Sequence, residues 1–76
     1  MSLTIILNGQ SRTFEGLAPS ADVEAVIAAL GLKGDRVAVE YNGEIVRRTA
    51  WGETRLDEGD RLEVVHFVGG GSGLPG

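Results

Sequence analysis

The residues best suited to chemistry lie at the C-terminus, where Gly69, Gly70 and Gly71 begin an eight-residue segment that ends at Gly76 and holds five glycines. No polar spacer separates them from the apolar stretch before, and we expect a flexible tail. A terminal carboxylate becomes reactive when ATP converts it to an acyl-adenylate, from which a sulfur donor can displace AMP. Residues without Cβ can thread the narrow channel that this chemistry needs. A disordered terminus or a leftover linker is the alternative that composition leaves open.

Side chains that commonly carry out catalysis are scarce in the sequence. The absence of cysteine excludes disulfides, thiolate metal ligands and a cysteine nucleophile. His66 is the only histidine, and without a nucleophile to serve we expect it to be a partly buried structural residue. Asp57, Glu58 and Asp60 lack the spacing of a calcium loop, so we expect a turn there. We therefore predict no catalytic residue, no metal site and a protein that is not an enzyme.

Exposed apolar residues beside the tail suggest a surface for partners. The alternation of the last strand places Val65 and Phe67 on the sheet face opposite the helix, and Ile6 of the first strand is expected to join them. Three such residues on adjacent strands would form a contiguous docking patch next to the reactive end. The alternative is that these are ordinary scattered surface hydrophobes.

Strands and a helix position these residues. Alternating apolar residues indicate the strands, and two Asn-Gly pairs favour tight hairpin turns between them. The expected strands are Leu3–Leu7, Ser11–Phe14, Arg36–Tyr41, Ile45–Val46 and Arg61–Val68. Between the second and third strands, apolar residues at helical spacing predict one amphipathic helix: Val23, Val26, Ile27 and Leu30.

The ends of this helix and the loop after the fourth strand have their own signals. Asp22 is the expected N-cap and Gly31 the expected C-terminal stop. The segment 47–55 is expected to be irregular, with Trp51 as an anchor packed on the edge of the core.

This order of elements predicts an α+β fold with a mixed sheet of four to five strands packed on one main helix. If the first and last strands pair in parallel in mid-sheet, the topology is the β-grasp, or ubiquitin-like, fold. The chain is then one domain over residues 1–68, followed by a glycine-rich tail over residues 69–76.

Composition excludes several classes of function. The net charge of −4 disfavours nucleic acid as a partner, because nucleic-acid binding requires a basic surface. The longest apolar run is far shorter than the roughly 20 residues of a membrane helix, and the N-terminus does not resemble a signal peptide. We therefore expect a cytoplasmic protein that does not bind membranes.

Two segments of the sequence resemble a known family. Residues 56–71, LDEGDRLEVVHFVGGG, are similar to the C-terminal signature of the thiamine-biosynthesis sulfur carriers, the ThiS family, whose relatives include the small subunits of molybdopterin synthase. The opening LTIILNG, residues 3–9, and the helix end ALGL, residues 29–32, resemble the same family. The resemblance covers residues 1–71 and favours the thiamine branch.

The resemblance implies that Gly70 and Gly71 are the diglycine that is adenylated, converted to a thiocarboxylate and used to donate sulfur for thiazole formation. It implies three partners: an E1-like adenylating enzyme (ThiF/MoeB type), a thiazole synthase (ThiG type), and a sulfur donor such as a cysteine desulfurase or a sulfurtransferase. ATP and magnesium would belong to the adenylating enzyme, so this chain is expected to bind no cofactor itself.

One feature departs from the family, whose members usually end at the diglycine. Here residues Ser72 to Gly76 follow, so Gly71 has no free carboxylate as written. We expect a protease to trim the chain before Ser72. The alternatives are that the last five residues are an artefact of production and that this version is not adenylated. The alternatives for function are a related carrier for molybdopterin, cysteine or tRNA thiolation, and a non-covalent ubiquitin-like binding module or conjugation tag.

Overall fold

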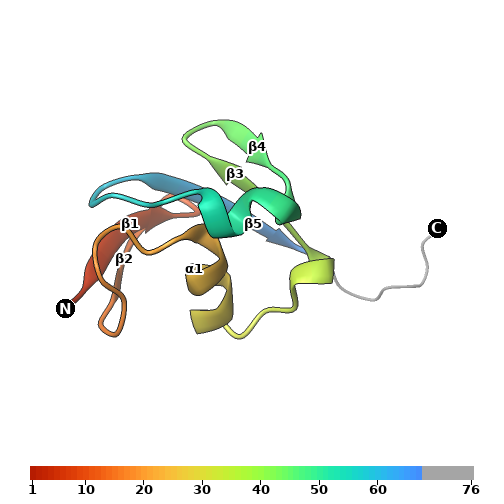
Figure 1. The fold of residues 1–76 in the computed structure, drawn as a ribbon. Helices are drawn as coiled ribbons and strands as arrows, with labels where there is room; N and C mark the ends of the chain where they lie inside the picture. The colour runs from red at the N-terminus through yellow and green to blue at the C-terminus, as the bar shows by residue number, and fades with distance from the viewer. Residues whose placement is uncertain (68–76) are drawn as a thin grey trace.

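The computed structural model describes residues 1–67 and contains one five-stranded sheet with a single α-helix on one of its faces (Figure 1). The strands lie in the order β2-β1-β5-β3-β4. Their bounds are β1 Leu3–Leu7, β2 Gln10–Phe14, β3 Val37–Tyr41, β4 Glu44–Val46 and β5 Arg61–His66. Val68 and the predicted tail, from Gly69 to Gly76, lie outside the described residues.

The sheet is mixed, because two of its three inner strands, β1 and β5, run in the same direction. β1 and β5 pair in parallel, with Ile6 opposite Arg61 and Leu7 opposite Leu62. The other three pairings are antiparallel. This is the β-grasp topology that the order of elements predicted.

Both Asn-Gly pairs form the hairpin turns expected of them. Asn8 and Gly9 have φ values of 50° and 82°, and Asn42 and Gly43 have φ values of 49° and 92°. Two successive positive φ angles define the type I′ turn, whose twist matches that of the flanking strands. Local sequence therefore sets the register of both hairpins.

The helix α1, Val23–Ala29, is capped at both ends as predicted. Its first turn is closed by the Asp22 carboxylate, which accepts a hydrogen bond from the Ala25 N–H at 2.8 Å. At the other end Gly31 has φ +75°, and the N–H groups of Gly31 and Leu32 donate to the carbonyls of Ala28 and Ile27. This pair of bonds is the Schellman arrangement, which only a residue tolerant of positive φ permits.

The core lies between α1 and the inner face of the sheet, below the strands in Figure 1. Side chains alternate along β1, so that Leu3, Ile5 and Leu7 are buried while Thr4 and Ile6 are not. The buried hydrophobic set is Leu3, Ile5, Leu7, Phe14, Val23, Val26, Ile27, Val39, Trp51, Leu56 and Leu62. Among residues 1–67 no helix is long and apolar enough to cross a membrane.

The connections contain two 3₁₀ helices that the sequence did not predict: η1, Gly34–Arg36, and η2, Arg48–Glu53. Arg36 is therefore helical, where a strand was predicted, and the segment expected to be irregular is largely regular. Trp51 is the buried anchor that was predicted: it is 3% exposed, and its Nε1–H donates to the Val46 carbonyl at 3.1 Å.

Candidate docking face

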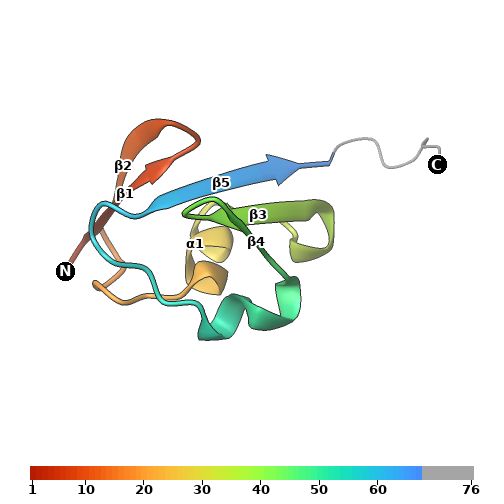
Figure 2. The same ribbon diagram turned by 90° about the horizontal axis from the view of Figure 1, so that it is seen from above.

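β5 carries Val65, one of the predicted docking residues, and Phe67 follows its last residue. The strand extends past the β1–β2 hairpin toward the C-terminal end of the chain (Figure 2). Its odd-numbered residues point away from the core, whereas Leu62 is fully buried and Val64 packs against the core cluster. Val65 is 56% exposed and Phe67 is 53% exposed. Exposure at this level is unusual for large apolar side chains on neighbouring positions of one face.

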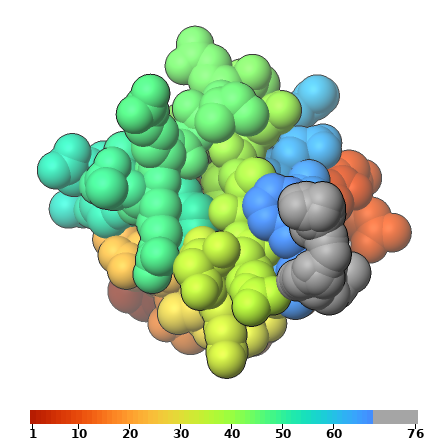
Figure 3. Space-filling view, turned by 90° about the vertical axis from the view of Figure 1, so that its right-hand side faces the viewer, coloured from red at the N-terminus to blue at the C-terminus, as the bar shows by residue number. Residues whose placement is uncertain are grey.

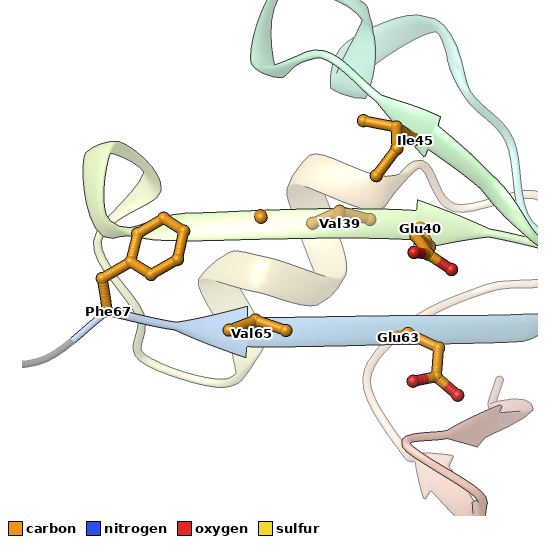
Figure 4. A pocket seen from close by; sticks show the side chains of 7 residues that line it. Val39, Glu40, Ile45, Glu63, Val65 and Phe67 are labelled. Atoms are coloured by element: carbon orange, nitrogen blue, oxygen red, sulfur yellow. The ribbon is translucent and has the colours of Figure 1, made fainter.

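Two further residues join Val65 and Phe67 on this outer face of the sheet. Ala38 of β3 lies directly opposite Val65, and Ile45 of β4 is 69% exposed. Together with Val65 and Phe67 they line a shallow hollow of about 230 Å³ across three strands (Figure 4). We call Ala38, Ile45, Val65 and Phe67 the outer patch.

Ile45 was missed by sequence reasoning, and Ile6 does not lie where it was expected. The alternation from Asn42-Gly43 would have placed Ile45 on the outer face, but only the strand order shows that β3 lies next to β5 and β4 next to β3. Ile6 is half-buried and faces the same side of the sheet, but its partner is Arg61. Val65 lies four residues further along β5, about 13 Å away, so the structure does not bring Ile6 next to the outer patch.

The outer patch has an acidic edge. Glu40 and Glu63 are direct cross-strand partners on β3 and β5, and both line the hollow. Figure 4 shows their carboxylates on the side of the hollow away from Phe67. An apolar centre with a charged rim is the usual composition of a protein–protein interface.

The end of β5 is held in place by Asn8, although β1 has already turned away there. The Asn8 side chain accepts a hydrogen bond from the Val64 N–H at 2.7 Å and donates to the Val64 carbonyl at 3.1 Å. The side-chain amide thereby makes the two hydrogen bonds that the backbone of a residue on a neighbouring strand would otherwise make to Val64. Figure 3, which views the molecule from this end, shows the end of β5 in blue between the hairpin and β3.

We predict that Asn8→Gly lowers the free energy of unfolding by about 1–2 kcal/mol, because two hydrogen bonds to Val64 are lost while glycine keeps the positive φ. Urea denaturation followed by circular dichroism measures this loss. In Asn8→Asp the acceptor of the 2.7 Å bond is retained, so we expect an intermediate stability. Equal stability of all three proteins would show that Asn8 does not support β5.

The acidic run before β5 is a turn, as predicted, and it is tied to both neighbouring strands. The Tyr41 hydroxyl donates to Asp60 Oδ2 at 2.7 Å, and the Asp57 N–H donates to the same oxygen at 2.8 Å. Gly59, at φ +84°, donates its N–H to the Thr4 carbonyl at 2.8 Å. Within the part of the chain that the structure describes, no group of three or more metal-ligating side chains occurs.

The hydrogen bond to Asp60 raises the pKa of Tyr41 from 10.0 to about 12, and burial and the charges of Asp60 and Asp57 add to the effect. For Asp60, burial opposes ionisation. The hydrogen bonds from the Asp57 N–H and from the Tyr41 and Asn42 side chains outweigh burial and lower the pKa of Asp60.

We predict that Tyr41→Phe lowers the free energy of unfolding by about 1 kcal/mol at neutral pH, because the hydrogen bond to Asp60 is lost. In the native protein the neutral tyrosine contributes stability fully below pH 10, and this is lost as pH rises toward about 12. The ionised Asp60 contributes above pH 4, roughly its unfolded pKa, and its contribution is lost as pH falls through its lower folded pKa. Urea denaturation at a series of pH values measures both losses of stability, at high and at low pH. Both losses should be smaller in Tyr41→Phe. Identical pH profiles would contradict the assignment.

His66 is exposed, which corrects the expectation of a partly buried histidine. Alternation does place it on the Leu62 and Val64 side of β5, as predicted. Burial on that face decreases along the strand, from the fully buried Leu62 through the half-buried Val64 to the exposed His66 at its end.

Comparison with known proteins identifies the family to which this chain belongs. The model of the ThiS family matches residues 5–71, which include all of the sheet except the first two residues of β1, and the glycines at positions 70 and 71. The chain belongs to the ThiS family. The match confirms the resemblance found in residues 56–71 of the sequence.

Individual ThiS relatives support the assignment. The sulfur carrier protein ThiS of Bacillus subtilis is 39% identical over 49 residues, which cover 64% of this chain and 74% of that protein. The crystal structure of the thiamine biosynthesis protein ThiS from Geobacter metallireducens is 36% identical, with a TM-score of 0.76 over 91% of this chain and 100% of that one. The β-grasp fold is thus shared with a ThiS protein of known structure.

Some relatives of this ThiS-family chain are much longer. A thiazole synthase of Paramagnetospirillum magneticum is 40% identical over 70 residues, and one of Magnetococcus marinus is 38% identical over 73 residues. These stretches cover 92% and 96% of this chain but only 21% and 22% of the two proteins. The chain therefore spans about a fifth of the length of these curated relatives.

Proposed function

We propose that this ThiS-family chain is a sulfur carrier for thiamine biosynthesis that works as a co-substrate and not as a catalyst. The observation that carries the proposal is the family match to residues 5–71, which extends through the diglycine Gly70-Gly71. The name of the Bacillus subtilis relative, a sulfur carrier protein, supports the same function.

The reactive group is the carboxylate of Gly71 once the Gly71–Ser72 peptide bond has been hydrolysed. A carboxylate oxygen attacks the α-phosphate of ATP, and pyrophosphate leaves. The terminal sulfur of a protein persulfide then attacks the acyl carbon, and AMP leaves. A thiol cleaves the resulting acyl disulfide, giving a disulfide and the thiocarboxylate. The two glycines serve this chemistry because a Cβ would obstruct the channel through which the end must pass.

The docking face limits where the chemistry can occur. Phe67 precedes Gly71 by four residues, and four fully extended residues span at most about 14 Å. A partner that covers the outer patch therefore has its reacting centre within that distance of Phe67. The adenylating enzyme and the sulfur acceptor both need to meet this condition.

The acceptor we propose is thiazole synthase. Proteins of that name in two organisms contain a stretch 38–40% identical to nearly the whole of this chain. A carrier and an acceptor that act on the same sulfur atom need to meet repeatedly, and one polypeptide holding both raises their effective concentration.

The test is the intact mass of the purified protein after incubation with ATP, magnesium, a sulfide source and lysate of the source organism. A species that ends at Gly71 with one oxygen replaced by sulfur is the expected product, and it should be absent when ATP is withheld. A protein that stays unmodified at full length would contradict the proposal, and conjugation to a lysine would instead indicate a ubiquitin-like tag.

A further inference from the structure

Two glutamates of like charge occupy directly opposite positions on neighbouring strands at the edge of the outer patch. Glu40 and Glu63 are directly opposite on β3 and β5, and Glu40 is half-buried. Arg61 lies on the same face, but on the far side of Glu63 from the patch and beside Ile6. Like charges in direct cross-strand positions destabilise a sheet. The pair is thus unfavourable for the isolated domain, and a cation brought from outside would offset the repulsion.

We propose that thiazole synthase docks on the outer patch with a lysine or arginine side chain placed between Glu40 and Glu63. An apolar side chain next to this cation would fill the hollow between Ile45 and Val65. The inference rests on the proposed function and specifies the surface of the partner: an apolar residue beside a basic one. An arginine fits best, because its planar guanidinium can donate to two carboxylates at once.

Three arguments favour a partner with a basic residue over a purely apolar one. The hollow has an apolar floor but an acidic wall, so a purely apolar side chain would leave two carboxylates to be desolvated without a partner. The net charge of the chain is −4, which attracts a basic surface over distance. Finally, a charge pair at the rim of an interface selects the correct partner and accelerates association.

The test is the affinity of the full-length chain for thiazole synthase, measured by titration calorimetry at low and at physiological salt. We expect the double variant E40Q/E63Q to bind at least about 10-fold more weakly at low salt and to lose most of the salt dependence. The matched control is E15Q/E53Q, which removes the same charge from two exposed positions away from the outer patch and should bind within about twofold of wild type.

A second measurement separates docking from folding. Because E40Q/E63Q removes the repulsion, its melting temperature should rise by a few degrees, about 1–4 °C, while its affinity falls. A loss of affinity together with a lower melting temperature would overturn the proposal, because damage to the sheet would then explain the weaker binding.

The remaining outcomes are also decisive. If E40Q/E63Q binds thiazole synthase as tightly as the wild type or more tightly, the inference is overturned. The variant V65D then tests the outer patch alone: if it binds thiazole synthase more weakly, the partner docks on the patch without a cation at the two glutamates. If E40Q/E63Q weakens binding only to the adenylating enzyme, thiazole synthase is the wrong occupant. Thiocarboxylate formation, measured separately by intact mass, reports whether the proposed function itself fails.

Discussion

Replacing Gly71 by alanine is expected to reduce thiocarboxylate formation by about 100-fold or more. A methyl group at the terminal residue would displace the carboxylate from the α-phosphate of ATP, and a misplacement of about 1 Å is enough for a loss of this size. The measurement is the rate at which the thiocarboxylate mass appears with the adenylating enzyme, ATP and a sulfur donor. The same substitution at Gly70 should have a similar effect.

The matched control for this experiment is Gly16→Ala. Gly16 lies in the loop after β2, where an added Cβ meets nothing within 4 Å. Its thermal stability and rate of thiocarboxylate formation should both equal those of the wild type. If Gly71→Ala formed the thiocarboxylate at the wild-type rate, the diglycine would not be the reactive end.

Replacing Phe67 by aspartate is expected to weaken binding to the adenylating enzyme by about 2 kcal/mol or more, which is about 30-fold in Kd. Phe67 is 53% exposed on the outer patch and lies close to the reactive end, so its ring would be buried in the complex. A charge there would be desolvated without a partner. Titration calorimetry with the purified enzyme measures the change.

A matched control comes from the other edge of the same sheet face. Ser11 is exposed on β2 and pairs with Ile6, so Ser11→Asp adds the same charge two strands away from β5. We expect its affinity to stay near that of the wild type. If Phe67→Asp bound as well as Ser11→Asp, the outer patch would not be the docking surface for this enzyme.

Much of the fold follows from local signals. The two Asn-Gly pairs, the Asp22 cap and the Gly31 stop each specify backbone geometry within a few residues, and the structure shows all of them as predicted. The 3₁₀ helices were missed because three-residue periodicity is too short to stand out in a sequence.

The exposed position of His66 shows a different limit. Alternation predicts the side of a strand on which a residue lies, and it did so correctly for β5. It carries no information on how far the covering helix extends. The stop of α1 was predicted correctly, but which part of β5 the core covers depends on how the layers are assembled, and His66 at the end of the strand is exposed.

The outer patch is assembled by pairing between strands that are distant in sequence. The alternation of residues 61–67 predicted that Val65 and Phe67 point outward. The C-terminal signature predicted the family to which the chain belongs. The sequence did not determine that β3 pairs with β5 and β4 with β3, which brings Ile45 to the patch, or that Ile6 lies beside Arg61. Nor did it show Glu40 opposite Glu63. Register between remote strands is set by how the whole core packs, and only the tertiary structure contains that information.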